Sequence, residues 1–352
     1  MILDSPGRDL KLIDIPFETP DVGAIKARVK SRPDDFMVDE EPAYELCGKG
    51  DHLYIQVEKK GWSMERLLLH LREALDVSQA EIGYAGLKDK HAVTRQWLSV
   101  PARCEERLSK VDNGAVRLLD TNRHTNKLRT GHLRGNRFNI LLRGAAQEQV
   151  EAVRTVTDQV VARGLVNIFG NQRFGQNLES ARVGRDVVAG VMRISAMSRM
   201  KRKFSISSIQ SYLFNLYVRE RMALDRLRQV MAGDIMKKRD TGGLFVAEDV
   251  SEVQARLDAG QLVVTGPIFG RKMVQAGGEA GQLEIAAMAQ IGMNHYSFDS
   301  FHSYGAGTRR ALLTFPEDME VEACKSGIRL RFFLPKGCYA TVLLREVLKR
   351  DV

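Results

Sequence analysis

Residues 83–96 read GYAGLKDKHAVTRQ, a glycine-containing loop in which lysines flank a single aspartate, Asp89. Cations beside a carboxylate lower its pKa, and an ionised carboxylate can serve as a nucleophile or a base. Gly83 and Gly86 carry no side chain, so a substrate backbone can approach this loop closely. By residue types alone, the loop also fits a solvated surface turn. It is not a phosphate-binding P-loop, because the GxxxxGK[ST] spacing is absent.

The segments around this loop show regular apolar patterns. Residues 52–59 alternate between apolar and polar side chains, which predicts a half-buried strand. A helix is predicted from Ser63, a suitable N-cap, because leucines recur at helical spacing after it. Similar patterns predict strands at 96–100 and 138–142, and a helix at 148–163 that stops before a glycine.

The second half of the chain changes character. Spaced apolar residues predict a long amphipathic helix over Ser207–Met231. Residues 232–285 are rich in glycine and short apolar runs, which predicts small strands and loops. A strand is predicted at Ile328–Leu334 and a closing helix at Tyr339–Lys349. Strands and helices mix without a regular βαβ alternation, so the predicted fold class is α+β.

Composition limits the class of protein. The chain has 352 residues, 44% of them hydrophobic, which is enough for more than one domain. Its 53 Lys plus Arg against 44 Asp plus Glu permit a polyanionic partner without requiring one. The four scattered cysteines form no zinc-binding spacing, so reduced cytosolic thiols fit better than structural zinc or disulfides. We expect neither a signal peptide nor a membrane span, because no suitable apolar run occurs.

Residues 117–143 form a strongly basic segment, with seven Lys or Arg residues and Asp120 as the one acid. Cations contact RNA phosphates, and an aromatic ring such as Phe138 can stack on an unpaired base. Asn136 lies two positions before Phe138, so in a strand both side chains point to one face. The alternative is a basic strand pair in which Phe138 belongs to the core, and the residues alone do not decide between the two.

The stretch 83–96 resembles the signature loop of the TruD family of tRNA pseudouridine synthases, because it keeps the pattern AGxKDKxAxTxQ. Four further motifs resemble that family and occur in its order. They are KSRPDDF at 30–36 with VDEE at 38–41, KLRTGHLRGNRF at 127–138, VNIFGNQRFG at 166–175, and LRFFLPKGCYATVLLRE at 330–346. Together the five motifs span nearly the whole chain.

This resemblance implies an architecture that the local patterns do not give. Members of the family share a pseudouridine-synthase core, a mixed but largely antiparallel sheet flanked by helices. The core would be discontinuous, made of residues 1–166 and 306–352. A TruD-specific α+β domain, the TRUD domain, would be inserted at residues 167–305.

The resemblance also implies a substrate and a set of site residues. The family target is uridine 13 in the D arm of certain tRNAs, so we expect tRNA as the partner and neither a cofactor nor a metal. Asp89 matches the family's catalytic aspartate. The other family active-site positions fall on Lys30, Asp34, Lys88, Asn136 and Phe138. At the position of Asp34, glutamate is also common in the family. We expect a cytoplasmic protein, and a monomer because no heptad seam appears.

Two other functions compete with this one. A non-catalytic RNA-binding protein, such as a tRNA-folding chaperone, could use the same scaffold, but the intact lysine-aspartate-lysine sequence around Asp89 argues against it. An RNA methyltransferase is expected to carry a glycine loop for S-adenosylmethionine, and no GxGxG loop follows a strand. The sequence leaves open which tRNAs are modified, and whether Asp89 attacks C1′ of the ribose or abstracts a sugar proton.

Overall fold

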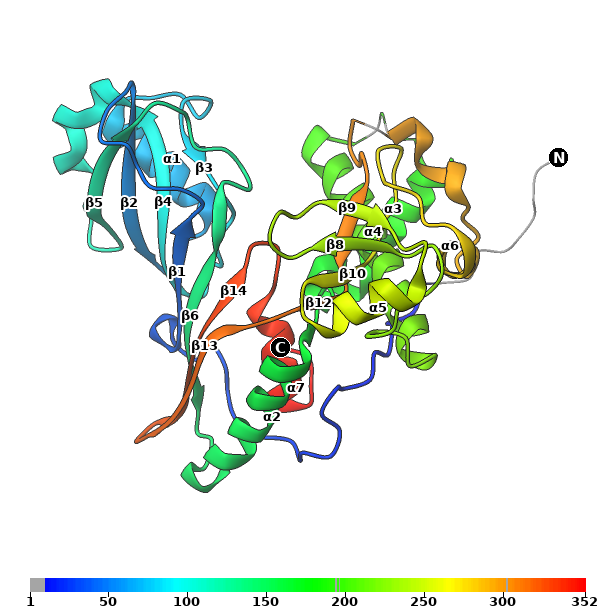
Figure 1. The fold of residues 1–352 in the computed structure, drawn as a ribbon. Helices are drawn as coiled ribbons and strands as arrows, with labels where there is room; N and C mark the ends of the chain where they lie inside the picture. Colours follow the sequence, from blue (N-terminus) through cyan, green and yellow to red (C-terminus); the bar gives the residue numbers. More distant parts are fainter. Residues whose placement is uncertain (1–9, 194, 196, 302) are drawn as a thin grey trace. The chain divides into compact units, whose positions relative to one another are not determined.

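The computed structural model describes residues 10–193, 195, 197–301 and 303–352. The chain divides into two compact units (Figure 1). The sheet unit contains Asp21–Gly164 and Phe315–Arg350. The inserted unit contains Leu165–Thr314 together with described residues before Asp21 and the last two residues. Among the described residues, no helix is both long and apolar enough to cross a membrane.

An eight-stranded sheet dominates the sheet unit, with the strand order β13-β14-β6-β1-β4-β2-β5 and β3 paired to β4. Only the β1–β4 pair is parallel, so the sheet is mixed and largely antiparallel. The strands are β1 (Phe36–Pro42), β2 (His52–Lys60), β3 (Gly83–Tyr84), β4 (Val93–Pro101), β5 (Val116–His124), β6 (Leu133–Arg143), β13 (Glu317–Cys324) and β14 (Gly327–Pro335).

The helices of the sheet unit are α1 (Met64–Leu75), α2 (Val150–Arg163) and α7 (Ala340–Leu348). Helix α1 starts where predicted, because the Ser63 hydroxyl accepts the backbone N–H of Arg66 at 3.3 Å. Its leucines, including the fully buried Leu67 and Leu71, pack against alternate residues of β2 and β4. Truncating one such leucine to alanine typically costs about 2–5 kcal/mol of stability, so this contact fixes the sheet on which the charged loop rests.

The inserted unit is built on a second, four-stranded sheet in the order β11-β10-β8-β9 and a short β12–β7 pair. Its elements are β7 (Leu165–Val166), α3 (Glu179–Val188), α4 (Arg199–Ala223), β8 (Ile235–Lys238), β9 (Leu244–Val246), α5 (Val250–Asp258), β10 (Leu262–Ile268), α6 (Gly278–Ala289), β11 (Thr308–Ala311) and β12 (Leu313–Thr314). Helices α3 and α4 approach closely at Gly184, where an added Cβ would lie 2.2 Å from the carbonyl oxygen of Ser205. Any larger residue would therefore force these helices apart.

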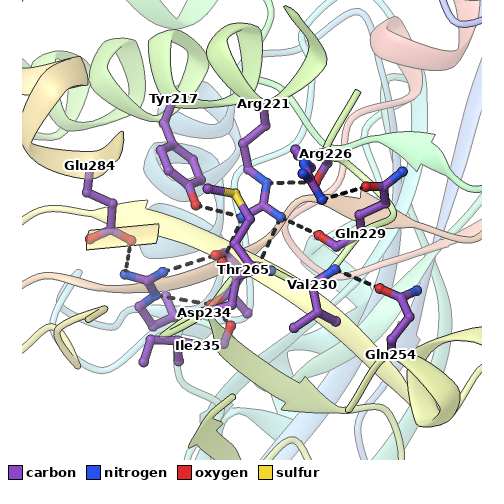
Figure 2. Close-up of polar contacts among 12 residues, drawn as sticks. Tyr217, Arg221, Arg226, Gln229, Val230, Asp234, Ile235, Gln254, Thr265 and Glu284 are labelled. Atoms are coloured by element: carbon purple, nitrogen blue, oxygen red, sulfur yellow. Dashed lines mark hydrogen bonds and ion pairs between the residues drawn. The ribbon is translucent and has the colours of Figure 1, made fainter. Parts of the chain in front are cut away.

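A buried polar network ties α4 to Asp234, the residue before β8, in the inserted unit (Figure 2). The guanidinium of Arg221 donates to both carboxylate oxygens of Asp234, at 2.6 and 3.1 Å, and to the hydroxyl of Tyr217 at 3.0 Å. It also donates to the carbonyls of Arg226 and Gln229, so its donors are used by the chain that leaves the helix. A second buried pair, Arg309 with Glu284, is joined to this region through Thr265.

Two predictions for the inserted unit are wrong. The helix predicted at Ser207–Met231 runs from Arg199 to Ala223, because Asp225 adopts a left-handed backbone with φ of 53°. Leu227 continues the apolar spacing of the helix, which suggested that the helix is longer. It is instead a buried residue of the turn that follows α4, and Arg221 holds this turn through the carbonyl of Arg226. The region 232–285 contains helix α5 and most of helix α6 besides the predicted strands.

Candidate active site

The charged loop joins β3 to β4 and lies over a row of residues that crosses the sheet. The register places Lys59, Thr94, Val38, Phe138 and Phe332 opposite one another on β2, β4, β1, β6 and β14. Residues directly opposite in neighbouring strands point to the same face of a sheet. The row therefore presents a buried lysine at one end and two phenylalanine rings at the other.

Asp89 is held at three points. Lys30 donates to carboxylate oxygen Oδ2, and the backbone N–H of His91 donates to Oδ1 at 2.9 Å. The ammonium of Lys59 donates to the backbone carbonyl of Asp89 at 2.7 Å. Burial raises the pKa of the Asp89 carboxyl, but the bonds from Lys30 and His91 outweigh burial and hold it below the ordinary value. With 33% of its side chain exposed, Asp89 is an ionised carboxylate that a substrate can reach.

Lys30 occupies an unusual backbone conformation. Its φ of 57° lies in the left-handed region, which costs a residue with a side chain on the order of 1 kcal/mol. The ammonium group lies 4.5 Å from the centroid of the Phe36 ring, on the strand next to Phe138. The strained backbone thus aims one cation at both the Asp89 carboxylate and an aromatic face.

Lys88 contacts the carboxylate of Glu40 and not that of Asp89, its neighbour in the sequence. Its ammonium forms an ion pair with Glu40 at 2.6 Å and donates to the side-chain oxygen of Asn136 at 2.5 Å. Burial raises the pKa of Glu40, while the charge of Lys88 opposes that rise. The Glu40 and Lys88 side chains are 1% and 6% exposed. Lys88 is the residue before Asp89, so these contacts anchor the loop to β1 and β6 next to the catalytic candidate.

Phe138 lies in an aromatic cluster in the sheet unit. Its ring stacks on Phe332 with centroids 5.2 Å apart, and Phe36 meets it edge-on at 6.2 Å. Only 7% of Phe138 is exposed. The stack on Phe332 covers much of one face of the ring, so at most the opposite face is available to a base.

Asp34 is placed apart from the other site residues. Its exposed carboxylate accepts hydrogen bonds from Lys60 at 2.7 and 2.8 Å. The neighbouring Asp35 is the buried one, and it accepts two hydrogen bonds from Arg143, one of them at 2.8 Å to Nε. These bonds hold the pKa of Asp35 below its ordinary value. The structure thus joins Lys30 to Asp89 and Lys88 to Asn136, but gives Asp34 a partner outside this group.

Two residues at the site escaped the sequence reasoning, Lys59 and Glu40. Burial lowers the pKa of Lys59 to about 8, although the Asp89 carboxylate opposes that shift. The alternation along 52–59 contained the signal, because residue 59 falls on the same face as the apolar residues 53, 55 and 57. Glu40 lies within a family motif, but only strand register shows that it faces Asn136.

Much of the positive charge of the basic segment 117–143 is neutralised by ion pairs in the structure. Five of its cations form ion pairs with acids that lie elsewhere in the sheet unit. These pairs are Arg117–Glu58, Arg123–Glu105, Arg134–Glu41 and Glu317, Arg137–Glu41 and Asp318, and Arg143–Asp35. Within the described part of the chain, no ion pair to an acid is formed by Lys127 or Arg129. The sequence count therefore overstated the charge available for phosphate contacts.

No group of three or more His, Cys, Asp or Glu residues that could hold a metal ion occurs in the described ranges. His70, in helix α1, bonds the carbonyl of Val111 at 2.8 Å and packs edge-on against Trp62, which is a structural role. The expectation that the chemistry needs no metal or cofactor stays a prediction.

Comparison with known proteins identifies the family. A sequence profile of the tRNA pseudouridine synthase D (TruD) family matches residues 13–205 and 191–347. The tRNA pseudouridine synthase D of Anaeromyxobacter dehalogenans (strain 2CP-C) is 41% identical over 344 residues, which cover 97% of this chain and 98% of that protein. A protein of the same name from Thermus thermophilus is 42% identical over 336 residues, covering 95% of this chain and 92% of its own length.

A solved structure from Methanosarcina mazei that carries the TruD name superposes with a TM-score of 0.75. It is 23% identical and covers 96% of this chain and 97% of its own, so it supports the fold alone. The predicted fold class and the family resemblance are both confirmed. The methyltransferase alternative is wrong, because the match to tRNA pseudouridine synthases covers 97% of the chain. The chain therefore belongs to the TruD family of tRNA pseudouridine synthases, which are isomerases.

Proposed function

We propose that this enzyme converts uridine 13 in the D arm of certain tRNAs to pseudouridine, with Asp89 as the reacting carboxylate. The observation that carries the proposal is the state of Asp89, which is ionised by Lys30 and the His91 N–H yet still partly exposed. The target uridine has to leave its base stack to reach such a group, as in other enzymes that act on a base.

The chemistry is an isomerisation. The C1′–N1 bond of uridine breaks, the uracil turns, and a C1′–C5 bond forms, after which the C5 proton passes to solvent and N1 gains one. An ionised Asp89 serves either as a nucleophile at C1′ or as the base that removes a sugar proton. Both routes need the carboxylate form, which the contacts of Lys30 favour.

The remaining family positions are proposed as supporting groups. Lys30 orients and ionises Asp89, and Lys88 with Asn136 anchors the loop. Phe138 is proposed to hold the uracil with the ring face that Phe332 does not cover. Asp34 is proposed to contact the RNA, since its side chain and that of its partner Lys60 are both exposed. Single-turnover rates of Phe138→Leu and Asp34→Asn test both roles, and an unchanged rate in either variant removes that residue from the site.

The decisive experiment maps pseudouridine at single-nucleotide resolution. A tRNA transcript with uridine at position 13 is incubated with the wild-type enzyme or with Asp89→Asn, and a transcript with cytidine at position 13 is the matched control. We expect one modification, at position 13, made only by the wild type. Modification at another uridine would overturn the target, and modification by Asp89→Asn would overturn the role of Asp89.

We also propose that residues 1–166 and 306–352 fold together as one catalytic core around an inserted TRUD domain at 167–305. The two compact units have different bounds, because described residues before Asp21 and residues 306–314 lie in the inserted unit. A fragment that ends near Leu165 lacks β14 and leaves the apolar edge of β6 unpaired, so we expect it to aggregate. A soluble and active fragment would contradict the plan.

We likewise propose that the protein is a monomer, which light scattering checks. We also propose a cytoplasmic location, which fractionation checks.

A further inference from the structure

A pocket in the sheet unit lies beside the loop that connects β5 to β6. It has a volume of about 400 Å³ and is lined by Tyr44, His124, Asn126, Lys127, Arg129 and His132. Glu45 is the one acid in its wall. Lys127 and Arg129 are the two cations of the segment 117–143 that form no ion pair among the described residues. The charge that remains available in this segment thus lies on the short stretch 127–129, which lines this pocket and a neighbouring one.

The aromatic wall of the pocket is built from stacked rings. Tyr44 stacks on His124 with centroids 5.0 Å apart and planes 18° from parallel, and His132 meets Tyr44 edge-on at 5.9 Å. All three side chains are only partly buried. Rings that are fixed in place but still accessible suit stacking on a base, because little rotamer entropy is lost on binding.

A chain of hydrogen bonds sets the direction of donation between the side chains of this wall. Tyr54 donates its hydroxyl proton to the carbonyl of Asn126 at 3.0 Å, because a carbonyl can only accept. Tyr44, 3.1 Å away, must therefore donate to Tyr54, and Nδ1 of His132, 3.2 Å from Tyr44, must donate in turn. In neutral His132 the proton then sits on Nδ1, which leaves Nε2 as an acceptor for the N–H of a base.

The pocket is connected to the catalytic loop. The N–H of Gly131 donates to the carbonyl of Ala85 at 2.8 Å, and Ala85 is four residues before Asp89. An extended chain spans at most about 3.6 Å per residue, so the two Cα atoms of Ala85 and Asp89 are within roughly 15 Å of each other. Contact at the pocket can therefore accompany insertion of a nucleotide at Asp89.

We propose that this pocket binds a nucleotide of the substrate tRNA other than the target uridine. The phosphate lies against Lys127 and Arg129, and the base lies against Tyr44 and His132, with the Asn126 amide beside it. Glu45 is exposed and repels the phosphate from its own side, which orients the nucleotide. The ammonium of Lys127 donates to the carbonyl of Ala80, which lies outside the lining of this pocket, so Arg129 is the principal cation for the phosphate. The proposal rests on tRNA being the substrate, as in the proposed function.

The test measures tRNA affinity as a function of salt for five proteins: the wild type, Arg129→Gln, Tyr44→Leu, Tyr44→Phe and Arg154→Gln. Arg129→Gln should weaken binding about fivefold to tenfold and reduce the slope of log K against log salt by about one. Tyr44→Leu should weaken binding on the order of tenfold through the lost ring face. Tyr44→Phe keeps the ring and should stay within about threefold of the wild type.

Arg154→Gln is the matched control, since it removes another exposed arginine, in helix α2, where Arg154 pairs with Glu151. An equal loss of affinity in Arg154→Gln would overturn the proposal, because the effect of Arg129 would then be general charge. So would binding within twofold of the wild type in both Arg129→Gln and Tyr44→Leu. Thermal unfolding of each variant checks that the fold is kept.

A measurement on the unaltered enzyme guards against a misfolded Tyr44→Leu. A tRNA with single 4-thiouridines around position 13 is irradiated on the wild type, and the crosslinked peptides are identified. Crosslinks to peptides containing Tyr44 or residues 124–132 support the pocket, and crosslinks confined to other peptides overturn it. If no pseudouridine forms at position 13 while these contacts hold, only the proposed target fails. If pseudouridine forms there without these contacts, only the pocket fails.

Discussion

Two aspartates in this protein are each held by a basic side chain, and their surroundings differ. Asp234 and its partner Arg221, in the inserted unit, have no exposed side-chain surface. Tyr217 and two backbone carbonyls use the remaining donors of Arg221, so nothing further can bind (Figure 2). Asp89, in the sheet unit, keeps 33% of its side chain exposed, and its partner Lys30 keeps 17%.

The difference separates a carboxylate that holds the fold together from one that can react. Asp234 accepts two hydrogen bonds from Arg221 and one from the Met231 N–H, and because its side chain is fully buried no substrate can reach it. Asp89 has one N–H and one ammonium to keep it ionised, while solvent reaches the rest of it. Substitutions at the two aspartates should therefore fail in different assays.

The largest effect is expected at Asp89. Asp89→Asn is nearly isosteric but cannot act as a nucleophile or base, so turnover should fall by at least roughly four orders of magnitude. Binding of tRNA should stay near the wild-type value, because phosphate contacts come from other residues. Tritium release from 5-³H-uridine tRNA under single-turnover conditions measures the rate, with binding followed in parallel.

Asp89→Glu sharpens this test, because it keeps the carboxylate and moves it by about 1 Å, which typically costs on the order of a hundredfold in rate. Residual Asp89→Asn activity within tenfold of the wild type would remove Asp89 from the chemistry. Loss of binding together with activity would make Asp89 structural.

The second-largest effect is expected at Asp234 and in stability rather than in rate. Asp234→Asn leaves the charge of Arg221 buried without a counter-charge, which should cost about 3–5 kcal/mol in the unfolding of the inserted unit. Urea denaturation followed by circular dichroism measures this loss. The double variant Asp234→Leu with Arg221→Met removes both charges and should recover most of it. Equal stability of Asp234→Asn and the wild type would show that the pair is dispensable.

A smaller effect is expected at Lys59, which positions Asp89 without touching substrate. Lys59→Met keeps the length of the side chain but loses the bonds to the carbonyls of Asp89 and Trp62. The rate should fall about tenfold to a hundredfold through misplacement of Asp89. Stability should change little, because burial already disfavours the charged ammonium, whose pKa is lowered to about 8. If the free energy of unfolding falls by as much as the activation free energy of the reaction rises, Lys59 is a purely structural residue.

The smallest effect is expected in the pH profile of the wild type. The folded pKa of Asp89 lies below its ordinary value, so ionisation stabilises the fold above that value and the gain is lost only as pH falls through the lower folded pKa. The single-turnover rate should therefore change less than about twofold between pH 7 and 5, well above the ordinary aspartate pKa of about 3.9.

Lys30→Met supplies the contrast to this flat profile. It removes the main bond that opposes burial, so the pKa of Asp89 should rise and an acid limb should enter the same pH range. A flat profile in both proteins would mean that Lys30 does not tune this carboxylate.

Much of the sheet unit could be predicted because its signals are local. The Ser63 cap, the alternation along 52–59 and the glycine stop at Gly164 each depend on neighbours in sequence, and each is confirmed. The end of α4 could not be predicted, since the fold-back after it is held by the buried Arg221.

The site shows the same division between local and long-range information. Motifs drew attention to Lys30, Lys88 and Asp89, but which carboxylate each lysine contacts depends on strand register. Lys88 binds Glu40, and Lys30 binds Asp89 across 59 residues of sequence. Asp34 and Asp35 illustrate the limit, because one step along the chain separates an exposed carboxylate from a buried one. No composition or spacing rule distinguishes two such neighbours.

The order of strands in the large sheet has a consequence for synthesis. Strand β14 pairs with β6 along its whole length, yet the segment Leu165–Thr314 has to be translated between them. At roughly 5–20 residues per second, that segment takes on the order of ten seconds or more. Throughout that time the nascent chain carries an apolar strand edge without its neighbour, the kind of surface that recruits chaperones or other unfinished chains. Anything that slows the ribosome within Leu165–Thr314, such as rare codons, should therefore lower the yield of folded protein more than an equal delay placed before β6.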